Sequence, residues 1–181
     1  EFEISPTGEI TAVCGRFALT SKGRERRDVE KHLAAALARM LEPGELKTRR
    51  AAELTQFART AFAREDLEVA PGEEKLGAVY HRVSVAARVL GWVVDCYRTI
   101  QCPVCADAQF LVAVSGSPAL KVLSIRPVRP LELYGLPLDQ RRAEAFLNQF
   151  PGRAPETAGR VDAITGATKT SQAYERAVNE L

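Results

Sequence analysis

Residues 77–128 constrain the fold of this chain more than any other segment. Within them lie four runs that are rich in β-branched residues or alternate in polarity, separated by short breaks such as SGSP. The runs read AVYHRVSVAARV, GWVVDCY, QFLVAVS and ALKVLSIRPV. Such runs predict β-strands. Because consecutive strands without crossover helices pair antiparallel, we expect an antiparallel sheet.

Helices are predicted on both sides of these strands. Four segments carry apolar residues at helical spacing: residues 28–41, 49–64, 139–150 and about 170 to the end. Pro43 and Gly44 are expected to end the first of them, and Asp139 is expected to be the N-cap of the third. Residues 9–19 are expected to form a strand or hairpin, and residues 70–74 a loop. This order of helices, strands and helices indicates an α+β protein.

Length and composition exclude several classes of protein. The chain has 181 residues, enough for one domain with a sizeable core, which we expect to follow an N-terminal extension. The formal net charge of +2 is too small to predict nucleic-acid binding, and no run approaches the roughly 18 apolar residues of a membrane-spanning helix. The chain begins at Glu1 without methionine, from which we expect either a trimmed chain or a processed protein that has lost a leader or an anchor.

The segment DAITGAT near the C-terminus carries the strongest indication of chemistry. It places Thr165, Gly166, Ala167 and Thr168 directly before the last predicted helix. Gly166 allows a tight turn and the close approach of a ligand, and Ala167 adds little bulk. The free N–H groups and the dipole of a helix start favour an anion. A phosphate esterified to Thr168 would therefore be solvated by the backbone, with Lys169 beside it.

The same segment has the pattern Asp-x-x-Ser/Thr-Gly-Ala-Ser/Thr, and it resembles the flavinylation motif of the FMN-binding domain family. That family includes the covalent-flavin subunits of the sodium-translocating NADH:quinone reductase and of the Rnf complex. In it, a flavin transferase uses FAD to attach FMN through a phosphoester to the last Ser or Thr of the motif, which is Thr168 here. The resemblance makes further residues candidates for the flavin site: Asp162, Thr165, Gly166, Ala167, Lys169, Thr170 and Glu132.

The order of the predicted elements extends this resemblance to residues 30–181, with residues 1–29 as the N-terminal extension. The family fold is α+β, with a curved antiparallel sheet that carries the flavin and is flanked by helices, and we expect a single domain of this type. The membrane-complex subunits have a Glu-Thr-Pro-Gly segment near the flavin. Here the corresponding candidate is LELYGLP, in which Glu132 and Tyr134 are the candidate flavin contacts.

Four cysteines suggest a second site. Cys102 and Cys105 form a Cys-x-x-Cys pair, for which the resembled family has no general need. Ala106 stands where a c-type haem needs histidine, which excludes that cofactor. The remaining interpretations are a structural disulfide, a redox-active dithiol, and a zinc site completed by Cys14 or Cys96. We predict the disulfide or the dithiol and no metal, and the even number of cysteines favours an oxidising compartment.

Together these features predict an extracytoplasmic electron-transfer flavoprotein domain, periplasmic or at the cell surface, that carries FMN on Thr168. A covalent tether retains the cofactor where free FMN is scarce. We expect the flavin rather than a side chain to carry electrons, either in an enzyme or in a simple carrier. The expected partners are a flavin transferase and membrane-associated redox proteins. The sequence does not decide whether the full-length protein has a membrane anchor.

Two other functions are compatible with the sequence. The first is a flavin-linked thiol-disulfide oxidoreductase in which Cys102 and Cys105 exchange electrons with the flavin. The second is a sensing or assembly module that keeps the fold and has no redox activity. The number of electrons that the protein takes up distinguishes these functions.

Overall fold

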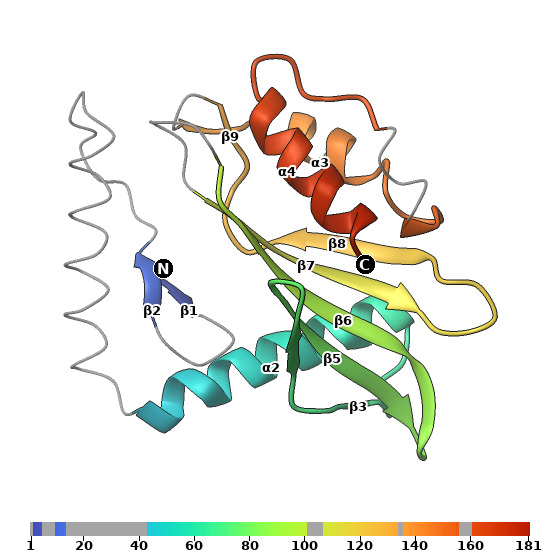
Figure 1. Ribbon diagram of the computed structural model, residues 1–181. Coiled ribbons are helices and arrows are strands. Elements are labelled where there is room, and N and C mark those ends of the chain that lie inside the picture. Colours follow the sequence, from blue (N-terminus) through green and yellow to red (C-terminus); the bar gives the residue numbers. More distant parts are fainter. Residues whose placement is uncertain (1, 5–9, 14–42, 101–106, 134–135, 156–160) are drawn as a thin grey trace. The chain divides into compact units, whose positions relative to one another are not determined.

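A computed structural model describes the chain as two compact units, Glu1–Leu54 and Thr55–Leu181 (Figure 1). The residues that it describes are 2–4, 10–13, 43–100, 107–133, 136–155 and 161–181. The helix predicted at residues 28–41 and the domain boundary predicted at residue 30 lie outside this set. None of the described helices is long and apolar enough to cross a membrane.

The first unit contains a β-hairpin and the beginning of a helix. β1 (Phe2–Ile4) pairs antiparallel with β2 (Ile10–Val13). A strand is therefore present within the predicted residues 9–19, its partner β1 lies before them, and residues 14–19 lie outside the described set. The helix α2 (Pro43–Phe62) begins earlier than the predicted residue 49 and ends in the second unit. Its start at Pro43 has a simple reason, because the fixed φ and missing N–H of proline suit the first turn of a helix.

The second unit contains a six-stranded antiparallel sheet in the order β3-β5-β6-β7-β8, with β4 paired to β5. The four long strands confirm the four predicted runs: β5 (Ala78–Val85), β6 (Arg88–Arg98), β7 (Ala108–Ser115) and β8 (Val122–Pro127). Two short strands complete the sheet, β3 (Glu68–Val69) and β4 (Glu73–Lys75). The loop predicted at residues 70–74 is therefore partly wrong, because Glu73 and Glu74 pair with β5 through the backbone.

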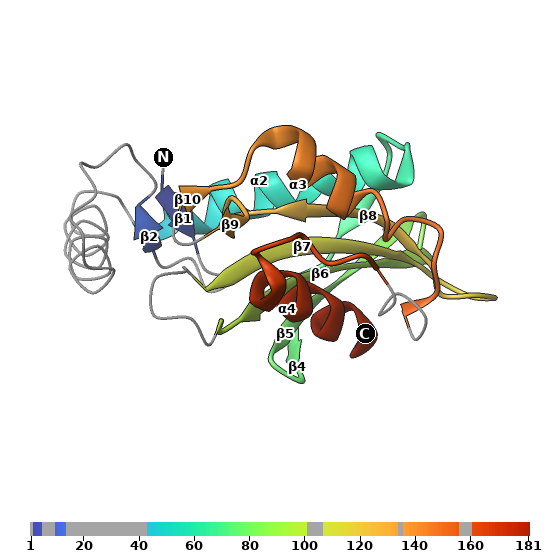
Figure 2. The same cartoon turned by 90° about the horizontal axis from the view of Figure 1, so that it is seen from above.

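Two helices follow the sheet in the chain. α3 (Gln140–Leu147) has the predicted N-cap, since the Asp139 carboxylate accepts a hydrogen bond of 3.0 Å from the N–H of Arg142. The small hairpin of β9 (Glu132–Leu133) and β10 (Leu136–Pro137) precedes it. α4 (Thr168–Asn179) begins two residues before its predicted start and lies over β6 and β7 (Figure 2).

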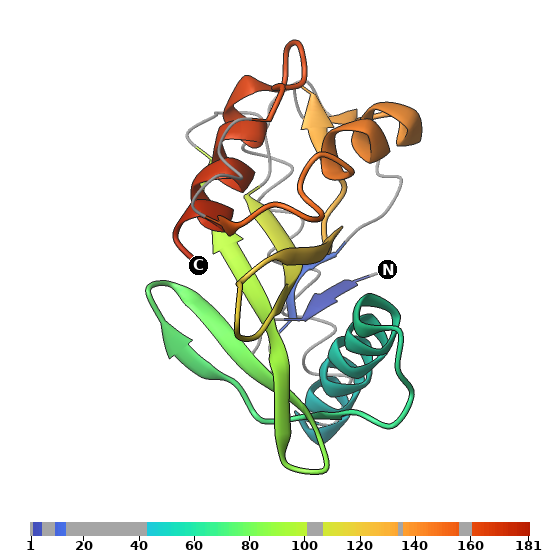
Figure 3. The ribbon, with the colours of Figure 1, turned by 90° about the vertical axis from the view of Figure 1, so that its right-hand side faces the viewer.

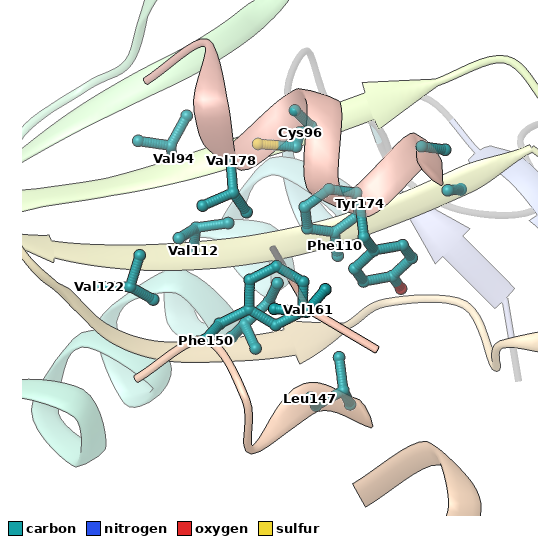
Figure 4. Close-up of a cluster of buried hydrophobic side chains, with 14 of the residues drawn as sticks. Val94, Cys96, Phe110, Val112, Val122, Leu147, Phe150, Val161, Tyr174 and Val178 are labelled. Carbon is teal, nitrogen blue, oxygen red and sulfur yellow. The ribbon is translucent and has the colours of Figure 1, made fainter. Parts of the chain in front are cut away.

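The core of this unit lies between the sheet and the pair α3 and α4, which cover the same face of the strands (Figure 3). Alternate residues of the long strands face the helices, among them Val94, Cys96, Phe110, Val112 and Val122 (Figure 4). The rings of Phe110 and Tyr174 are stacked, with centroids 3.9 Å apart. The helices and the antiparallel sheet confirm the predicted α+β class.

Candidate functional site

A β-turn at residues 164–167, here called the glycine turn, leads directly into α4. The N–H of Ala167 donates a hydrogen bond of 2.9 Å to the carbonyl oxygen of Ile164. Gly166, at the third position, has a φ of 83°, where any side chain would be strained. Thr165 and Gly166 are both exposed. The tight turn expected at Gly166 is therefore present, and its outer side is open to solvent.

Ser171 fixes the glycine turn to the first turn of α4. Its side chain is fully buried, and its Oγ accepts a hydrogen bond of 3.0 Å from the N–H of Ile164. The same hydroxyl donates a hydrogen bond of 3.1 Å to the carbonyl oxygen of Ala167. Sequence reasoning missed this residue. The available signal was a polar residue on the apolar face that Tyr174 and Val178 define at helical spacing.

Gln149 fixes the chain just before the glycine turn. Its Oε1 accepts a hydrogen bond of 2.7 Å from the N–H of Asp162, and its Nε2 donates one of 3.2 Å to the carbonyl oxygen of Asp162. The side-chain amide thus binds both polar backbone groups of one residue, as a neighbouring antiparallel strand would. Sequence reasoning also missed this role, while the predicted site residue Asp162 has an exposed side chain.

The start of α4 has the donors that a phosphate needs. Thr168 is the first residue of the helix, and the side chains of Thr168 and Lys169 are exposed. The first N–H groups of any helix have no acceptor within it, and they are partly positive. The N-cap residue is Ala167, which makes no side-chain hydrogen bond to these groups. These donors therefore fit an anionic phosphate on the Thr168 hydroxyl.

Two other predicted site residues, Thr170 and Glu132, are buried and lie against each other. The hydroxyl of Thr170 donates a long hydrogen bond of 3.5 Å to the carbonyl oxygen of Glu132. Only 4% of Thr170 and 6% of Glu132 are exposed. This contact brings β9 to the first turn of α4 from 38 residues away in the chain. Tyr134, the other candidate in this segment, lies outside the described residues.

Two surface hollows flank the first turn of α4. The cationic hollow, of about 210 Å³, is lined by Arg98, Thr99, Ile100, Lys169, Gln172, Ala173, Arg176 and Glu180. The neutral hollow, of about 270 Å³, is lined by Arg142, Ala145, Phe146, Gln149, Asp162, Ala163, Ile164 and Thr165. All predicted site residues from Asp162 to Lys169 thus line one of the hollows or belong to the segment between them.

The predicted cysteine pair, Cys102 and Cys105, lies outside the described residues, but both ends of the segment that holds it are described. The N–H of Ile100 donates a hydrogen bond of 3.1 Å to Oδ1 of Asp107, and the hydroxyl of Tyr97 donates one of 2.8 Å to Oδ2. Ile100 and Asp107 also line a small cavity together with Glu132, Thr170 and Tyr174. Ile100 and Asp107, the described residues on either side of the cysteine pair, therefore both lie beside α4.

Cys96 has the environment of a core residue rather than that of a reactive thiol. It is free and fully buried in the core, and burial raises the pKa of its thiol from 9.0 to about 12. A thiol with so high a pKa is protonated at neutral pH, and the thiolate is the form that attacks a disulfide. The other three cysteines lie outside the described residues, so the zinc site stays a prediction that the structure does not test.

Comparison with known proteins agrees with this geometry. Residues 106–181 match the family model of the FMN-binding domain, a stretch that runs from β7 through the glycine turn to the end of α4. The match confirms the resemblance that the motif indicated, and it suggests a flavin-binding role in electron transfer. No match was found among curated proteins, and none among solved structures.

Proposed function

Because the chain carries an FMN-binding domain over residues 106–181, we propose that it is an electron-transfer flavoprotein domain that holds FMN covalently on Thr168. The observation that supports this most is the exposed hydroxyl of Thr168 at the start of α4. The glycine turn precedes it, and the side chain of the alanine N-cap makes no hydrogen bond to the start of the helix. This arrangement presents a hydroxyl and solvates a phosphate at the same position.

In the proposed attachment, a flavin transferase joins the FMN half of FAD to Oγ1 of Thr168. The phosphoanhydride bond of FAD breaks and a phosphoester bond forms, while AMP leaves and the hydroxyl proton passes to solvent. Gly166 allows the transferase and its substrate to approach the backbone, and Ser171 and Gln149 hold the turn in place. When bound, FMN supplies the transfer of one or two electrons.

Intact mass spectrometry tests the attachment site directly. Co-expression with a flavin transferase in a compartment that contains FAD should add one FMN, less one water, to the mass of the chain. Thr168→Ser should retain this addition because it keeps a hydroxyl, and Thr168→Ala should lose it completely. Thr60→Ala is the matched control, since Thr60 is an exposed threonine outside the segment, and it should stay flavinylated; Thr165→Ala tests the other exposed threonine of the segment.

The variants also identify the result that would contradict the proposal. A Thr168→Ala protein that still carries FMN would exclude Thr168 as the acceptor. Loss of FMN in Thr165→Ala alone would identify Thr165, in the glycine turn, as the acceptor. Far-ultraviolet circular dichroism of each variant shows whether the loss of flavin reflects the loss of the fold.

The same proposal includes an extracytoplasmic location and membrane-associated redox partners. Its support is chemical, because a tethered FMN needs no supply of free cofactor, together with the Cys-x-x-Cys pair that suits an oxidising compartment. Fractionation of cells that make the full-length protein, followed by in-gel flavin fluorescence, tests the location. Flavinylated protein that appears only in the cytoplasmic fraction would contradict it.

A second candidate function is a flavin-linked thiol-disulfide oxidoreductase. It is favoured by one observation, that Ile100 and Asp107, on either side of the cysteine pair, share a cavity with Thr170 of α4. A disulfide between Cys102 and Cys105 would take two electrons from reduced FMN and two protons from the flavin and solvent. Anaerobic titration of the flavinylated protein should then need four electrons per chain in the wild type and two in Cys102→Ser/Cys105→Ser. Equal requirements in both proteins would exclude this function.

A further inference from the structure

The two hollows beside Thr168 differ in charge. The cationic hollow has three basic side chains, Arg98, Lys169 and Arg176, against the single carboxylate of Glu180. The neutral hollow has one of each sign, Arg142 and Asp162. A phosphoester-linked flavin is an anion, and its ring gains further negative charge on reduction at neutral pH. Opposite charges at short range attract, so electrostatics favours the cationic hollow for this ligand.

The cationic hollow is also on the correct side of α4 for a ligand tethered at Thr168. Residues four apart in a helix lie on the same face, so Thr168, Gln172 and Arg176 form one line along it. Gln172 and Arg176 both line the cationic hollow, and so does Lys169, the residue that follows the attachment point. A group esterified to Thr168 thus starts at one end of this hollow.

Apolar residues and a fixed cation line part of the cationic hollow. Ile100 and Ala173 are apolar and 5% and 6% exposed, and a methyl side chain at position 173 lets a planar group approach the helix closely. Arg98 is held in place by Glu180 at 2.6 Å and by the carbonyl oxygen of Gly77 at 3.0 Å. A cation that is fixed before the ligand arrives has little conformational entropy to lose on binding.

From these observations we propose that the flavin ring of FMN esterified to Thr168 lies in the cationic hollow, where Lys169 and Arg176 stabilise its reduced form. This inference rests on the proposed function, since it takes Thr168 as the attachment point. Its consequence is a reduction potential that depends on these two cations. Positive charge beside the ring favours the more negative, reduced state and therefore raises the potential.

The test compares the midpoint potentials of flavinylated variants, measured by titration with dithionite and a reference dye. Arg176→Gln and Lys169→Gln keep a polar side chain and remove the charge. Each is expected to lower the preference for the reduced flavin about tenfold, which is about 30 mV for a two-electron couple. Arg142→Gln removes one charge from the neutral hollow and serves as the matched control, with no expected change in potential.

Collisional quenching of flavin fluorescence by iodide gives a second measurement that does not depend on the potential. Iodide is an anion, so the two variants should also change quenching more than Arg142→Gln does. A lower potential in Arg142→Gln alone would place the ring in the neutral hollow, and unchanged potentials in all three variants would place it outside both; either result overturns this proposal.

Intact mass, recorded before any titration, separates this proposal from the proposed function. A wild-type chain without added FMN would overturn the attachment to Thr168, and the placement of the ring with it. A fully flavinylated chain whose midpoint potential is the same with and without the charges of Lys169 and Arg176 would overturn only the placement of the ring.

Discussion

The aromatic core and the glycine turn lie within the same unit and are stabilised by different interactions. In the core, the stacked rings of Phe110 and Tyr174 are almost fully buried, and Phe146 contacts Tyr174 edge-on with centroids 5.9 Å apart. In the glycine turn, Thr165 and Gly166 are exposed, and the backbone is held by hydrogen bonds with Ser171, while Gln149 holds Asp162 just before the turn. One region buries apolar area, and the other presents groups to solvent.

This difference between the core and the glycine turn predicts which substitutions should affect folding and which should affect flavin attachment. The stabilisation from burial scales with the apolar area that is removed from water, so it is concentrated in the core. The glycine turn buries only Ala167 and part of Ile164, and its main contribution is a backbone shape that presents the Thr168 hydroxyl. The three predictions that follow test how far these two contributions are separable.

The largest effect is expected in the core. Phe110→Ala removes a fully buried ring from its stack with Tyr174 and should lower the free energy of unfolding by about 3–5 kcal/mol. Urea denaturation measures this loss. Leu120→Ala is the control, because Leu120 is 42% exposed and should cost less than about 0.5 kcal/mol.

The same variant tests whether the two regions are separable. The chains of Phe110→Ala that remain folded should be flavinylated to the same extent as wild-type chains, since the variant leaves every hydrogen bond of the glycine turn in place. A folded but unflavinylated Phe110→Ala would show that the core positions the turn as well as stabilising the unit.

The next effect concerns pH and the buried thiol of Cys96. Burial raises the pKa of this thiol from 9.0 to about 12, so above pH 9 the unfolded chain releases a proton that the folded chain retains. The stabilisation is therefore complete below pH 9 and is lost as the pH rises towards 12, by up to about 1.4 kcal/mol per pH unit. Cys96→Val should remove this slope between pH 9 and 10.

Thermal or urea unfolding of both proteins at closely spaced pH values measures the slope. Tyr174 adds a similar loss at higher pH, because burial raises the pKa of its hydroxyl above 10.0, and this loss should persist in Cys96→Val. A wild-type protein whose stability falls no faster than that of Cys96→Val from pH 9 to 10 would mean that the thiol is solvated in solution.

Much of this fold could be predicted because periodic sequence patterns reflect burial. β-branched residues and alternating polarity predict the four long strands, apolar residues at helical spacing predict α3, and side-chain chemistry predicts the N-cap Asp139. The early start of α2 was missed because the segment after Pro43 is polar and lacks an apolar repeat. The strand β4 was missed because its pairing depends on backbone groups of β5, which leave no signal in the side chains of residues 73–75.

The residues of the candidate site likewise include some that the sequence predicts and some that it does not. Gly166 was predictable, because a glycine after a small polar residue is common in turns, where it supplies a positive φ. Ser171 and Gln149 were not predicted, because they act through hydrogen bonds to backbone groups 7 and 13 residues away. No regular spacing connects such partners. The cationic hollow was unpredictable for a related reason, since Arg98 and Arg176 come from different elements that only the folded sheet and α4 bring together.

Ser171→Ala, with the smallest expected effect, tests the link between the two regions. Ser171 lies on the buried face of α4 and also bonds to the glycine turn, so it belongs to both. Without its hydroxyl, the half-buried N–H of Ile164 loses its acceptor, which should cost about 1 kcal/mol of unfolding free energy.

The looser turn in Ser171→Ala should also slow flavinylation of Thr168, measured as the fraction of chains with added FMN over time. Asn179→Ala, an exposed position at the other end of α4, is the control and should change neither quantity. A loss of stability with an unchanged flavinylation rate would mean that the transferase itself shapes the turn, and that Ser171 serves the core alone.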